Sequence, residues 1–408
     1  MATYLLILVY FAFISLGLPD SLLGVTWPVM QPGFQVPFSF AGIASMVLSG
    51  GTIVSSLLSG RVLQRFGVGR VTFVSVMMTA AALLGFSLAP SFAWIIILSV
   101  PLGLGAGAVD SGLNEYVAEH YKAIHMNWLH CFWGVGAVSG PLIMSQLIAR
   151  DQSWRNGYLA VSLVQFALVA VLFFSLPVWE KAAPRAASAR AQADPAKTKA
   201  EKPAARGLFF PLQIRGVKFA LLAFLSYGCI ESTISLWSSS YLVHARGLDA
   251  ATAAAWVSSF YASITVGRLV SGFITLRVSN KMLIRTGELV ILAGVLLLFL
   301  PLPAIFALLA LILIGLGCAP IFPSMLHETP VRFGKENAQL VMGFQMAVAY
   351  FGSTLFPPLF GFIATNTSLA LLPVFILAYI ATLLASSERV NAMLAHKLKP
   401  AQQTSLGD

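Results

Sequence analysis

The feature that most constrains this chain is a series of apolar runs, each about 20 residues or longer, that recur along most of its length. A helical run of that length crosses about 30 Å of hydrocarbon. Only 10% of the 408 residues are charged and 58% are hydrophobic, a composition that excludes an ordinary soluble domain. The sequence therefore predicts an all-α membrane protein.

Twelve such runs can be marked out, and we expect twelve transmembrane helices in two six-helix bundles. The first run, from Tyr4 onward, has no basic segment before it and no small-residue cleavage site, so we expect a retained helix rather than a signal peptide. The expected spans are 4–30, 38–61, 70–90, 92–118, 127–149, 155–178, 214–243, 250–276, 282–300, 303–326, 336–365 and 368–386.

A polar segment, Glu180 to Arg215, divides the chain into two halves. It is rich in Ala, Lys, Arg and Pro and lacks periodic apolar residues, so we expect a flexible, solvated linker. The expected organisation is an N-terminal six-helix bundle (1–179), a cytoplasmic linker (180–213), a C-terminal six-helix bundle (214–390) and a cytoplasmic tail (391–408).

The two halves repeat at a constant offset of 212 residues. This shift places residues of three helices onto identical residues, which is hard to obtain by chance with only 33 glycines. Two parallel six-helix repeats are the signature of a major-facilitator-type transporter, which binds its substrate near the membrane midplane between the halves. The matched pairs are Ser59 with Ser271, Gly60 with Gly272, Arg65 with Arg277, Gly103 with Gly315, Gly105 with Gly317 and Gly140 with Gly352.

The positive residues predict the orientation, because cytoplasmic loops carry an excess of Lys and Arg. With a cytoplasmic amino terminus, the outer loops hold only Arg150, Arg155 and Arg246, and the other Lys and Arg fall at or near the inner face. The net charge of +10 therefore sets topology and does not indicate a nucleic-acid partner. We expect both termini in the cytoplasm and a bacterial-type inner (plasma) membrane location.

The stretch from Leu102 to His120 carries the first candidate site. Gly103, Gly107 and Ser111 recur every four residues and form a smooth stripe that lets another helix approach closely. Asp110 and Asn114 are also four apart and share one face. A carboxylate in hydrocarbon is costly, so Asp110 is expected to face a bundle interior or a wet cavity, where it marks an ion or substrate path or bonds a neighbouring helix.

After the second helix comes GRVLQRFGVGR, Gly60 to Arg70, which resembles the signature loop of the major facilitator superfamily. Gln64 occupies the place of the acid in that signature, while Arg65 and Gly67 remain. In that superfamily the loop holds helices together on the cytoplasmic side and takes part in alternating access. The resemblance implies conformational gating by four residues: Gly60, Arg65, Gly67 and the repeat partner Arg277.

A narrower resemblance is to the fucose–proton symporter family. It rests on Asp20 in helix 1, on GAGAVDSGLN with Asp110 and Asn114 in helix 4, and on MNWLHCFWGVGAVSGP in helix 5. Asp stands at position 110 where that family has Glu. The resemblance implies that one of the two acids binds protons and that the other joins proton release to sugar binding. We expect Asp20 to carry the proton and Asp110, beside Asn114, to join the proton to the substrate. Helix 5 adds two candidate substrate-binding residues, Asn127 and His130, and an interfacial or packing histidine is the alternative at 130.

In the second half, Tyr227, Glu231 and Ser235 share one helical face. The 212 offset places Ser232 opposite Asp20, so Glu231 is expected one position from its repeat partner. Tyr227, Glu231 and Gln345 are candidate substrate-binding residues, and structural packing is the alternative. Weaker candidates are Trp256, Tyr261 and Tyr350, and inner-end gates are expected at Glu115, Glu119, Arg268, His327 and Glu328.

The leading prediction is a secondary active transporter that takes up a small neutral polyhydroxylated substrate, such as a monosaccharide, with protons, by alternating access. The alternative is proton-driven efflux of a drug or metabolite, because GAVSGP (Gly136 to Pro141) resembles an antiporter motif and Asp20 and Glu231 could serve as counter-ions of a cation. Small-residue packing also explains that motif.

No enzyme is expected, because we find no nucleophile–base or metal-ligand constellation, and Cys131, Cys229 and Cys318 are far apart. A membrane receptor would need an appended signalling domain, and none is evident. The expected partners are a small-molecule substrate and the lipid bilayer, with no cofactor, H⁺ as coupling ion and a monomeric chain.

Overall fold

The structure, a computed structural model, describes residues 2–121, 123–192, 210–275 and 277–394, and every regular element in these ranges is a helix. The helices of the first half are α1 (Ala2–Asp20), α2 (Leu22–Phe34), α3 (Phe40–Phe66), α4 (Val68–Leu88), α5 (Phe92–His120), α6 (Ala123–Ile148) and α7 (Trp154–Gln192). Those of the second half are η2 (Phe210–Gln213), α8 (Val217–Arg246), α9 (Ala250–Ile274), α10 (Asn280–Phe299), α11 (Ile305–Phe333), α12 (Lys335–Asn366), η3 (Leu369–Leu371) and α13 (Leu372–Leu394).

Twelve helical segments of the described chain are long and apolar enough to cross a membrane, which confirms the expected number and fold class. Helices α1 and α2 together make the first span, Thr3–Phe34, and a break at Ser21 separates them. Pro19 lies beside this break, and a proline inside a helix removes a backbone hydrogen bond and kinks the chain. The break places Asp20 at a helix end in the middle of the span.

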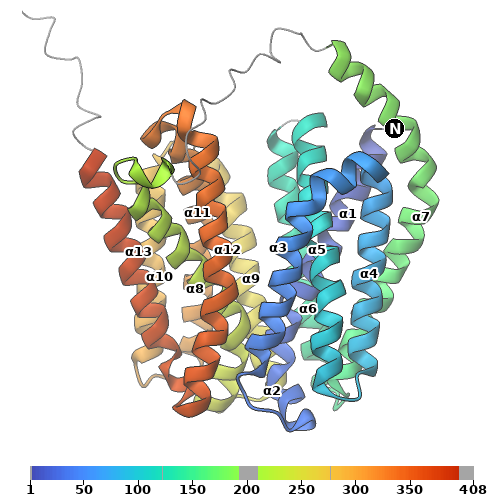
Figure 1. Ribbon diagram of the computed structural model, residues 1–408. Helices are drawn as coiled ribbons and strands as arrows, with labels where there is room; N and C mark the ends of the chain where they lie inside the picture. The colour runs from blue at the N-terminus through green and yellow to red at the C-terminus, as the bar shows by residue number, and fades with distance from the viewer. Residues whose placement is uncertain (1, 122, 193–209, 276, 395–408) are drawn as a thin grey trace, which may run out of the picture.

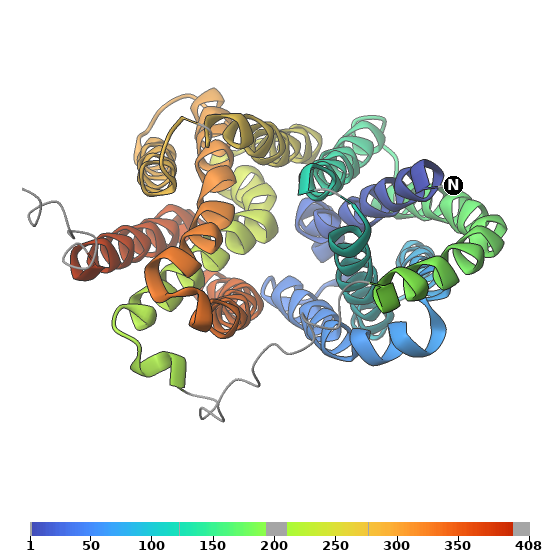
Figure 2. The same ribbon diagram turned by 90° about the horizontal axis from the view of Figure 1, so that it is seen from above.

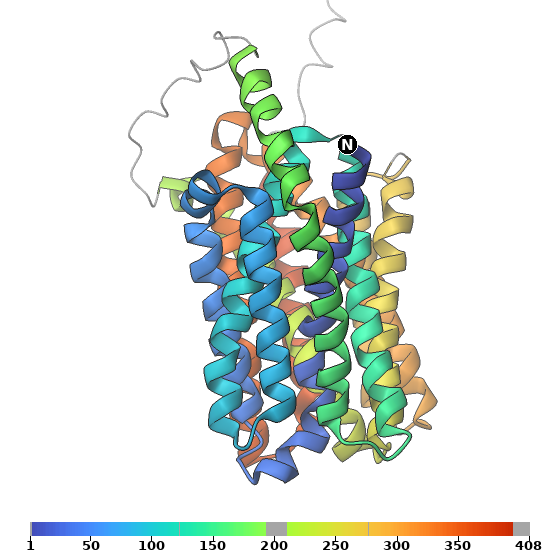
Figure 3. The same ribbon diagram turned by 90° about the vertical axis from the view of Figure 1, so that its right-hand side faces the viewer.

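Helix α7 corrects the expectation for the linker. It continues to Gln192, well past the predicted end of the sixth span, and Figure 3 shows it rising beyond the rest of the bundle. Alanine is the strongest helix former, and the segment after Glu180 is rich in it. A 3₁₀ helix (Phe210–Gln213) also lies within the expected linker, and α13 continues to Leu394, so residues 391–394 are helical rather than part of the tail.

Helices α1–α7 form one bundle and α8–α13 form the other, and the two stand side by side (Figures 1 and 2). Helix α1 begins and α13 ends at the same end of the molecule, which also carries Arg65, Arg70, Arg277 and Arg285. We call this end the basic end and the opposite one the far end.

The bundles touch at the far end and stand apart at the basic end in Figure 1. The Ser145 hydroxyl donates a hydrogen bond to the Ala251 carbonyl across the interface (2.7 Å), and the Ser239 hydroxyl donates to the Val25 carbonyl (3.2 Å). The Phe38 ring packs on Trp237 with centroids 5.0 Å apart. These contacts join the bundles toward the far end, and we call the region between the bundles on the basic side of these contacts the central space.

Equivalent glycines pack equivalent helix pairs in the two bundles. A Cβ atom added to Gly105 in α5 would lie 2.6 Å from the carbonyl oxygen of Ser75 in α4, and one added to Gly317 in α11 would lie 2.5 Å from that of Gly287 in α10. Both residues of the second contact lie 212 positions after those of the first. In lipid, helices associate by such close backbone approach. The repeat predicted from the sequence therefore also relates the contacts between helices in the two bundles. The same offset relates two further contacts, Gly103 with Leu48 and Gly315 with Phe260.

The offset is 211, not 212, for the first helix of each bundle. Gly17 in α1 packs against the α6 backbone at Ala137, and Gly228 in α8 packs against the α12 backbone at Ala349, the repeat partner of Ala137. Three residues after each glycine stands an acid, and these two acids are therefore direct repeat partners: Asp20 and Glu231. The expectation that Ser232 would match Asp20 is wrong by one position.

Candidate substrate and proton site

The end of α1 brings Asp20 to the interface between the bundles. The indole N–H of Trp133 in α6 donates a hydrogen bond to Asp20 Oδ2 (2.8 Å). Asp20 is exposed although it lies in the middle of the first span, so it borders the central space. Gly17 sets this geometry, because any side chain there would collide with the Trp133 carbonyl oxygen and push α1 away from α6.

Arg268 in α9 approaches the same tryptophan from the other bundle. Its guanidinium carbon lies 5.6 Å from the centroid of the Trp133 ring, a cation–π contact. Its Nη2 atom lies 3.6 Å from Oε1 of Glu231 in α8, and the two side chains are 23% and 26% exposed. The pair is thus partly open to the central space, at a distance too long for a direct hydrogen bond.

Two hydroxyl side chains complete this wall of the site. The hydroxyls of Tyr261 in α9 and Ser235 in α8 are hydrogen-bonded to each other. The Tyr261 ring meets the Trp133 ring edge-on, with centroids 6.4 Å apart and an angle of 71° between the planes. Tyr227, one turn before Glu231, is buried and packs on Phe322 with ring centroids 5.8 Å apart.

Asp110 and Asn114 lie one turn apart on α5, in the N-terminal bundle. The Asn114 side-chain amide donates to Asp110 Oδ1 and to the Asp110 carbonyl, both at 2.9 Å. Asp110 is close enough to interact electrostatically with Asp20 and with Tyr350 in α12. The predicted glycine stripe positions this helix, because a Cβ at Gly107 would collide with the Thr52 carbonyl oxygen of α3.

The site is therefore a cluster of three acids and one base. Glu231 has Arg268 as a cationic partner, whereas the hydrogen-bond donors to Asp20 and Asp110 among the described residues are neutral, an indole and an amide. Uncompensated charge is costly at membrane depth. Proton uptake by Asp20 or Asp110 removes such a charge, and proton uptake by Glu231 would leave an arginine without its partner.

Of the other predicted site residues, Gln345 lies elsewhere, His130 lies near Arg268, and Asn127 is only partly described. Gln345 is buried inside the C-terminal bundle and accepts a hydrogen bond from the Thr329 hydroxyl (2.9 Å), so its predicted place in the substrate cavity is corrected. His130 is half-buried, one turn before Trp133, with its ring edge-on to Phe13 at 6.0 Å. Asn127 lies in α6, but its side chain is outside the described part of the structure.

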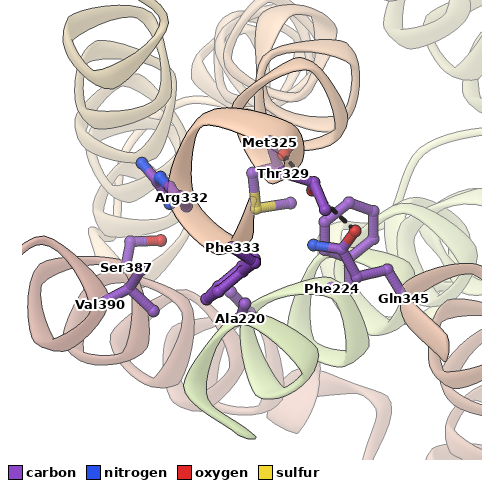
Figure 4. A pocket seen from close by; sticks show the side chains of 10 residues that line it. Ala220, Phe224, Met325, Thr329, Arg332, Phe333, Gln345, Ser387 and Val390 are labelled. Atoms are coloured by element: carbon purple, nitrogen blue, oxygen red, sulfur yellow. Dashed lines mark hydrogen bonds between the residues drawn. The ribbon is translucent and has the colours of Figure 1, made fainter. Parts of the chain in front are cut away.

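Gln345 lines a small pocket between α8, α11, α12 and α13, near the basic end (Figure 4). Arg332 and Ser387 also line this pocket. The volume open to the centre of a water molecule is about 10 Å³, which is room for about one water and far too little for a sugar. In the described residues, no group of three or more His, Cys, Asp or Glu side chains could hold a metal ion.

The predicted gating residues lie at the basic end. Gly67 joins α3 to α4 with a φ of +80°, a conformation that favours glycine. Arg65 is exposed and lies over the Phe66 ring at 5.4 Å, and nothing lies within 4 Å of a Cβ added to Gly60. Arg277 is exposed just after α9.

Of the expected inner-end gates, Glu328 pairs with Arg332 (3.1 Å) and His327 shares a hydrogen bond with Asn280 (3.0 Å), both within the C-terminal bundle. Glu115 is exposed, and the side chain of Glu119 is outside the described part. Arg268 instead reaches the central site, because its long side chain extends from α9 toward Glu231.

Sequence reasoning missed Trp133 and misplaced Arg268. The Trp133–Asp20 contact could have been predicted, because an indole N–H deep in an apolar helix needs an acceptor and Asp20 was already a candidate site residue. A central position for Arg268 could also have been predicted, because it is the arginine nearest the middle of any predicted span.

A fold of two six-helix repeats around a charged site at mid-membrane defines a secondary transporter rather than an enzyme. Residues 9–357 match the Major Facilitator Superfamily, and the chain belongs to this superfamily.

Two of the relatives are named for different substrates. The chain is 25% identical over 284 residues to the cis,cis-muconate transport protein of Acinetobacter baylyi, covering 66% of each chain, which is just under two thirds of that relative's length. It is 23% identical over 360 residues to the glucose/mannose transporter GlcP of Bacillus subtilis, covering 86% of each chain. These comparisons support the superfamily and do not single out fucose–proton symporters.

The fold also resembles a bacterial homologue of the human lysosomal transporter Spinster, solved in an inward-facing and unoccupied conformation. The TM-score is 0.73 at 14% identity, over 98% of this chain and 99% of that one. At this identity the likeness shows the fold alone.

Proposed function

We propose that this transporter takes up a small neutral polyhydroxylated molecule, such as a monosaccharide, together with protons. The observation that carries the proposal is Asp20, an exposed carboxyl in the middle of a span whose described hydrogen-bond partner is the neutral indole of Trp133. Such a group can change its charge as the central space opens to one side or the other. Proton and substrate must then change each other's affinity by the same factor.

In this proposal Asp20 carries the proton and Asp110, held by Asn114, links it to the substrate. The C-terminal bundle supplies polar groups suited to hydroxyls: the Tyr261 and Ser235 hydroxyls and the partly exposed Arg268–Glu231 pair. Trp133 offers an aromatic face beside them. The glucose/mannose transporter among the relatives supports this substrate class.

A second candidate substrate is a small organic anion. Arg268 supports it, because its guanidinium has donors that no short contact in the described residues occupies and could receive a carboxylate from the substrate. The relative named for muconate supports it as well.

Efflux of a cation, the alternative drawn from GAVSGP, is less well supported. Glu231 already faces Arg268, which leaves it less free to serve as a counter-ion. Gly136 and Gly140 within that motif pack against the α1 carbonyls of Ile14 and Leu18, which accounts for them as packing residues.

Orientation belongs to the same proposal. The basic end carries nearly all Lys and Arg, so we place it, with both termini, in the cytoplasm of a bacterial-type inner membrane. The transporting unit is one chain, because the site is formed between its own two halves.

The test is a thermal-stabilisation screen of the purified protein with D-glucose, L-fucose, D-glucuronate, cis,cis-muconate, uridine and ethidium, followed by uptake into proteoliposomes. Stabilisation by a sugar, with accumulation that depends on an imposed pH gradient, is expected. Stabilisation by ethidium alone would overturn the uptake proposal in favour of efflux, and stabilisation by the carboxylates alone would select the anion.

A further inference from the structure

We propose that Trp133 is the positioning residue through which the protonation state of Asp20, in the N-terminal bundle, reaches the Arg268–Glu231 pair, in the C-terminal bundle. This inference rests on the proposed role of Asp20 as the proton carrier. It assigns a coupling role to a residue that contacts both bundles.

The two chemical parts of the indole have different partners. The N–H group donates to Asp20 in α1, and the π face holds the guanidinium of Arg268 in α9. Arg268 in turn pairs with Glu231 in α8. Two further ionisable groups interact electrostatically with these side chains: Asp110 in α5 with Asp20, and His130 in α6 with Arg268. The chain of contacts thus runs from one acid, through the ring, to the repeat partner of that acid.

The backbone around Trp133 is tightly fixed. The Trp133 carbonyl touches α1 at Gly17, and the next residue, Gly134, meets Thr265 in α9 so closely that an added Cβ would collide with its side chain. The edge of Tyr261 closes one side of the ring. The helix axes are therefore held, and a change at Asp20 is expressed in the orientation of the ring.

Protonation changes how strongly that orientation is held. A hydrogen bond to an ionised carboxylate is roughly twice as strong as one between neutral groups. When Asp20 is charged, it holds the indole with its face toward Arg268. When Asp20 takes up a proton, the indole is released, and Arg268 is left to strengthen its contact with Glu231 or to bind the substrate.

The repeat shows that this arrangement belongs to one half alone. The partner of Trp133 at the 212 offset is Gln345, which is bonded to Thr329 inside its own bundle. Glu231 therefore has a cation from α9 where Asp20 has an indole. Asp20 is therefore the acid whose change of charge alters a contact with the opposite bundle.

The test is NMR of the indole N–H groups in ¹⁵N-tryptophan protein in nanodiscs, titrated with acid. It needs no transported substrate. Trp133→Phe assigns the Trp133 signal, and Trp27→Phe assigns a control indole that donates to the Phe38 carbonyl at 2.9 Å and has no titrating partner. We expect the Trp133 signal to titrate in the wild type and to stay fixed in Asp20→Asn, while the Trp27 signal stays fixed in both.

Arg268→Lys tests the contact across the bundles. Lysine keeps the charge beside Glu231 but stacks less well on an aromatic face. Since the ring–guanidinium contact favours charged Asp20, its loss should move the Trp133 titration to higher pH, by the equivalent of about fivefold in proton affinity, the lower end of ordinary coupling. An unchanged midpoint would mean that the Arg268–Trp133 contact does not affect the proton affinity of Asp20, and the inference would fail.

The two proposals fail in different ways. If Asp20→Asn accumulates D-glucose as the wild type does, the proton-carrier proposal is wrong. If Asp20→Asn loses accumulation while the Trp133 signal ignores pH, or titrates equally in Asp20→Asn, the carrier stands and the coupling role of Trp133 is wrong. If Trp133→Phe does not fold, the signal is assigned instead as the indole resonance whose chemical shift at neutral pH differs between the wild type and Asp20→Asn, and Arg268→Lys still decides.

Discussion

Asp20 and Glu231 occupy equivalent positions in the two bundles, yet one faces an indole N–H and the other a guanidinium. Equivalent glycines, Gly17 and Gly228, place both acids at the same depth. What differs is the helix that supplies the partner, α6 for Asp20 and α9 for Glu231. The two acids are thus alike in position and unlike in the charge of their partners.

The first prediction separates the roles of the two N-terminal acids. Asp20→Asn imitates the protonated form, so proton-driven accumulation should be abolished while substrate counterflow, which needs no net proton movement, is retained. Asp110→Asn should impair counterflow as well, because it also alters the Asn114 contact. Both are measured in proteoliposomes with an imposed pH gradient. Wild-type accumulation by both variants would remove the proton-coupling assignment, and opposite phenotypes would exchange the two roles.

A second prediction concerns Arg65 at the basic end. Arg65 lies far from the central site, so Arg65→Ala should lower the transport rate while equilibrium substrate binding stays within about twofold. Binding by calorimetry and transport by initial rates distinguish the two quantities. Arg150→Ala, a charge at the far end, is the matched control and should change neither. Loss of affinity with an unchanged rate would contradict the gating role.

A third prediction compares two glycines of the C-terminal bundle. Gly317→Ala should lower the melting temperature in detergent, because its Cβ would meet the Gly287 backbone, which cannot rotate away. Overpacking of this kind costs about 1–3 kcal/mol. Gly272→Ala places a Cβ where nothing lies within 4 Å, so it should be neutral or slightly stabilising. Equal melting temperatures for the two variants would show that the close helix approach does not support the fold.

A fourth prediction concerns Asp249, which caps helix α9 at the far end, outside the spans. Its side chain accepts a hydrogen bond from the Thr252 N–H (2.8 Å), and the pKa of Asp249 is lowered by the side chain of Thr252 first and by this backbone bond second. A lowered pKa means that the cap stabilises the folded protein above the unfolded pKa of Asp, near 4, and that this contribution is lost as the pH falls through the folded value. Asp249→Ala should cost about 1 kcal/mol at pH 7, and the difference from wild type should shrink toward pH 3. A difference independent of pH would exclude the carboxylate as the cap.

The number of spans, their order and the repeat could be predicted from the sequence, because hydrocarbon thickness fixes the length of an apolar run and close helix contacts need glycine at fixed places. The break beside Asp20 was within reach, since Pro19 cannot continue a regular helix. These features are set by local chemistry or by spacing along one helix.

The partners of the site acids could not be predicted in the same way. Arg268 lies near the basic end of α9, and only the direction of a long, flexible side chain brings it to Glu231. The 211 offset of the first helices means that the second half has one residue more before its next helix, and nothing in the sequence marks where. Gln345 was predicted to bind substrate because it is polar. Its side chain instead points into the C-terminal bundle, where it accepts a hydrogen bond from the Thr329 hydroxyl.

The inequality between Trp133 and Gln345 has a consequence for how such a chain can descend from one duplicated unit. A protein made of two N-terminal halves would hold four acids, two copies each of Asp20 and Asp110, beside an indole or an amide and with no guanidinium among them. Two C-terminal halves would hold two acids each neutralised by an arginine, and neither acid would need a proton. Only the unequal pair combines an acid whose hydrogen-bond donor is neutral with an ion pair, so divergence after duplication, more than the duplication itself, accounts for the present site.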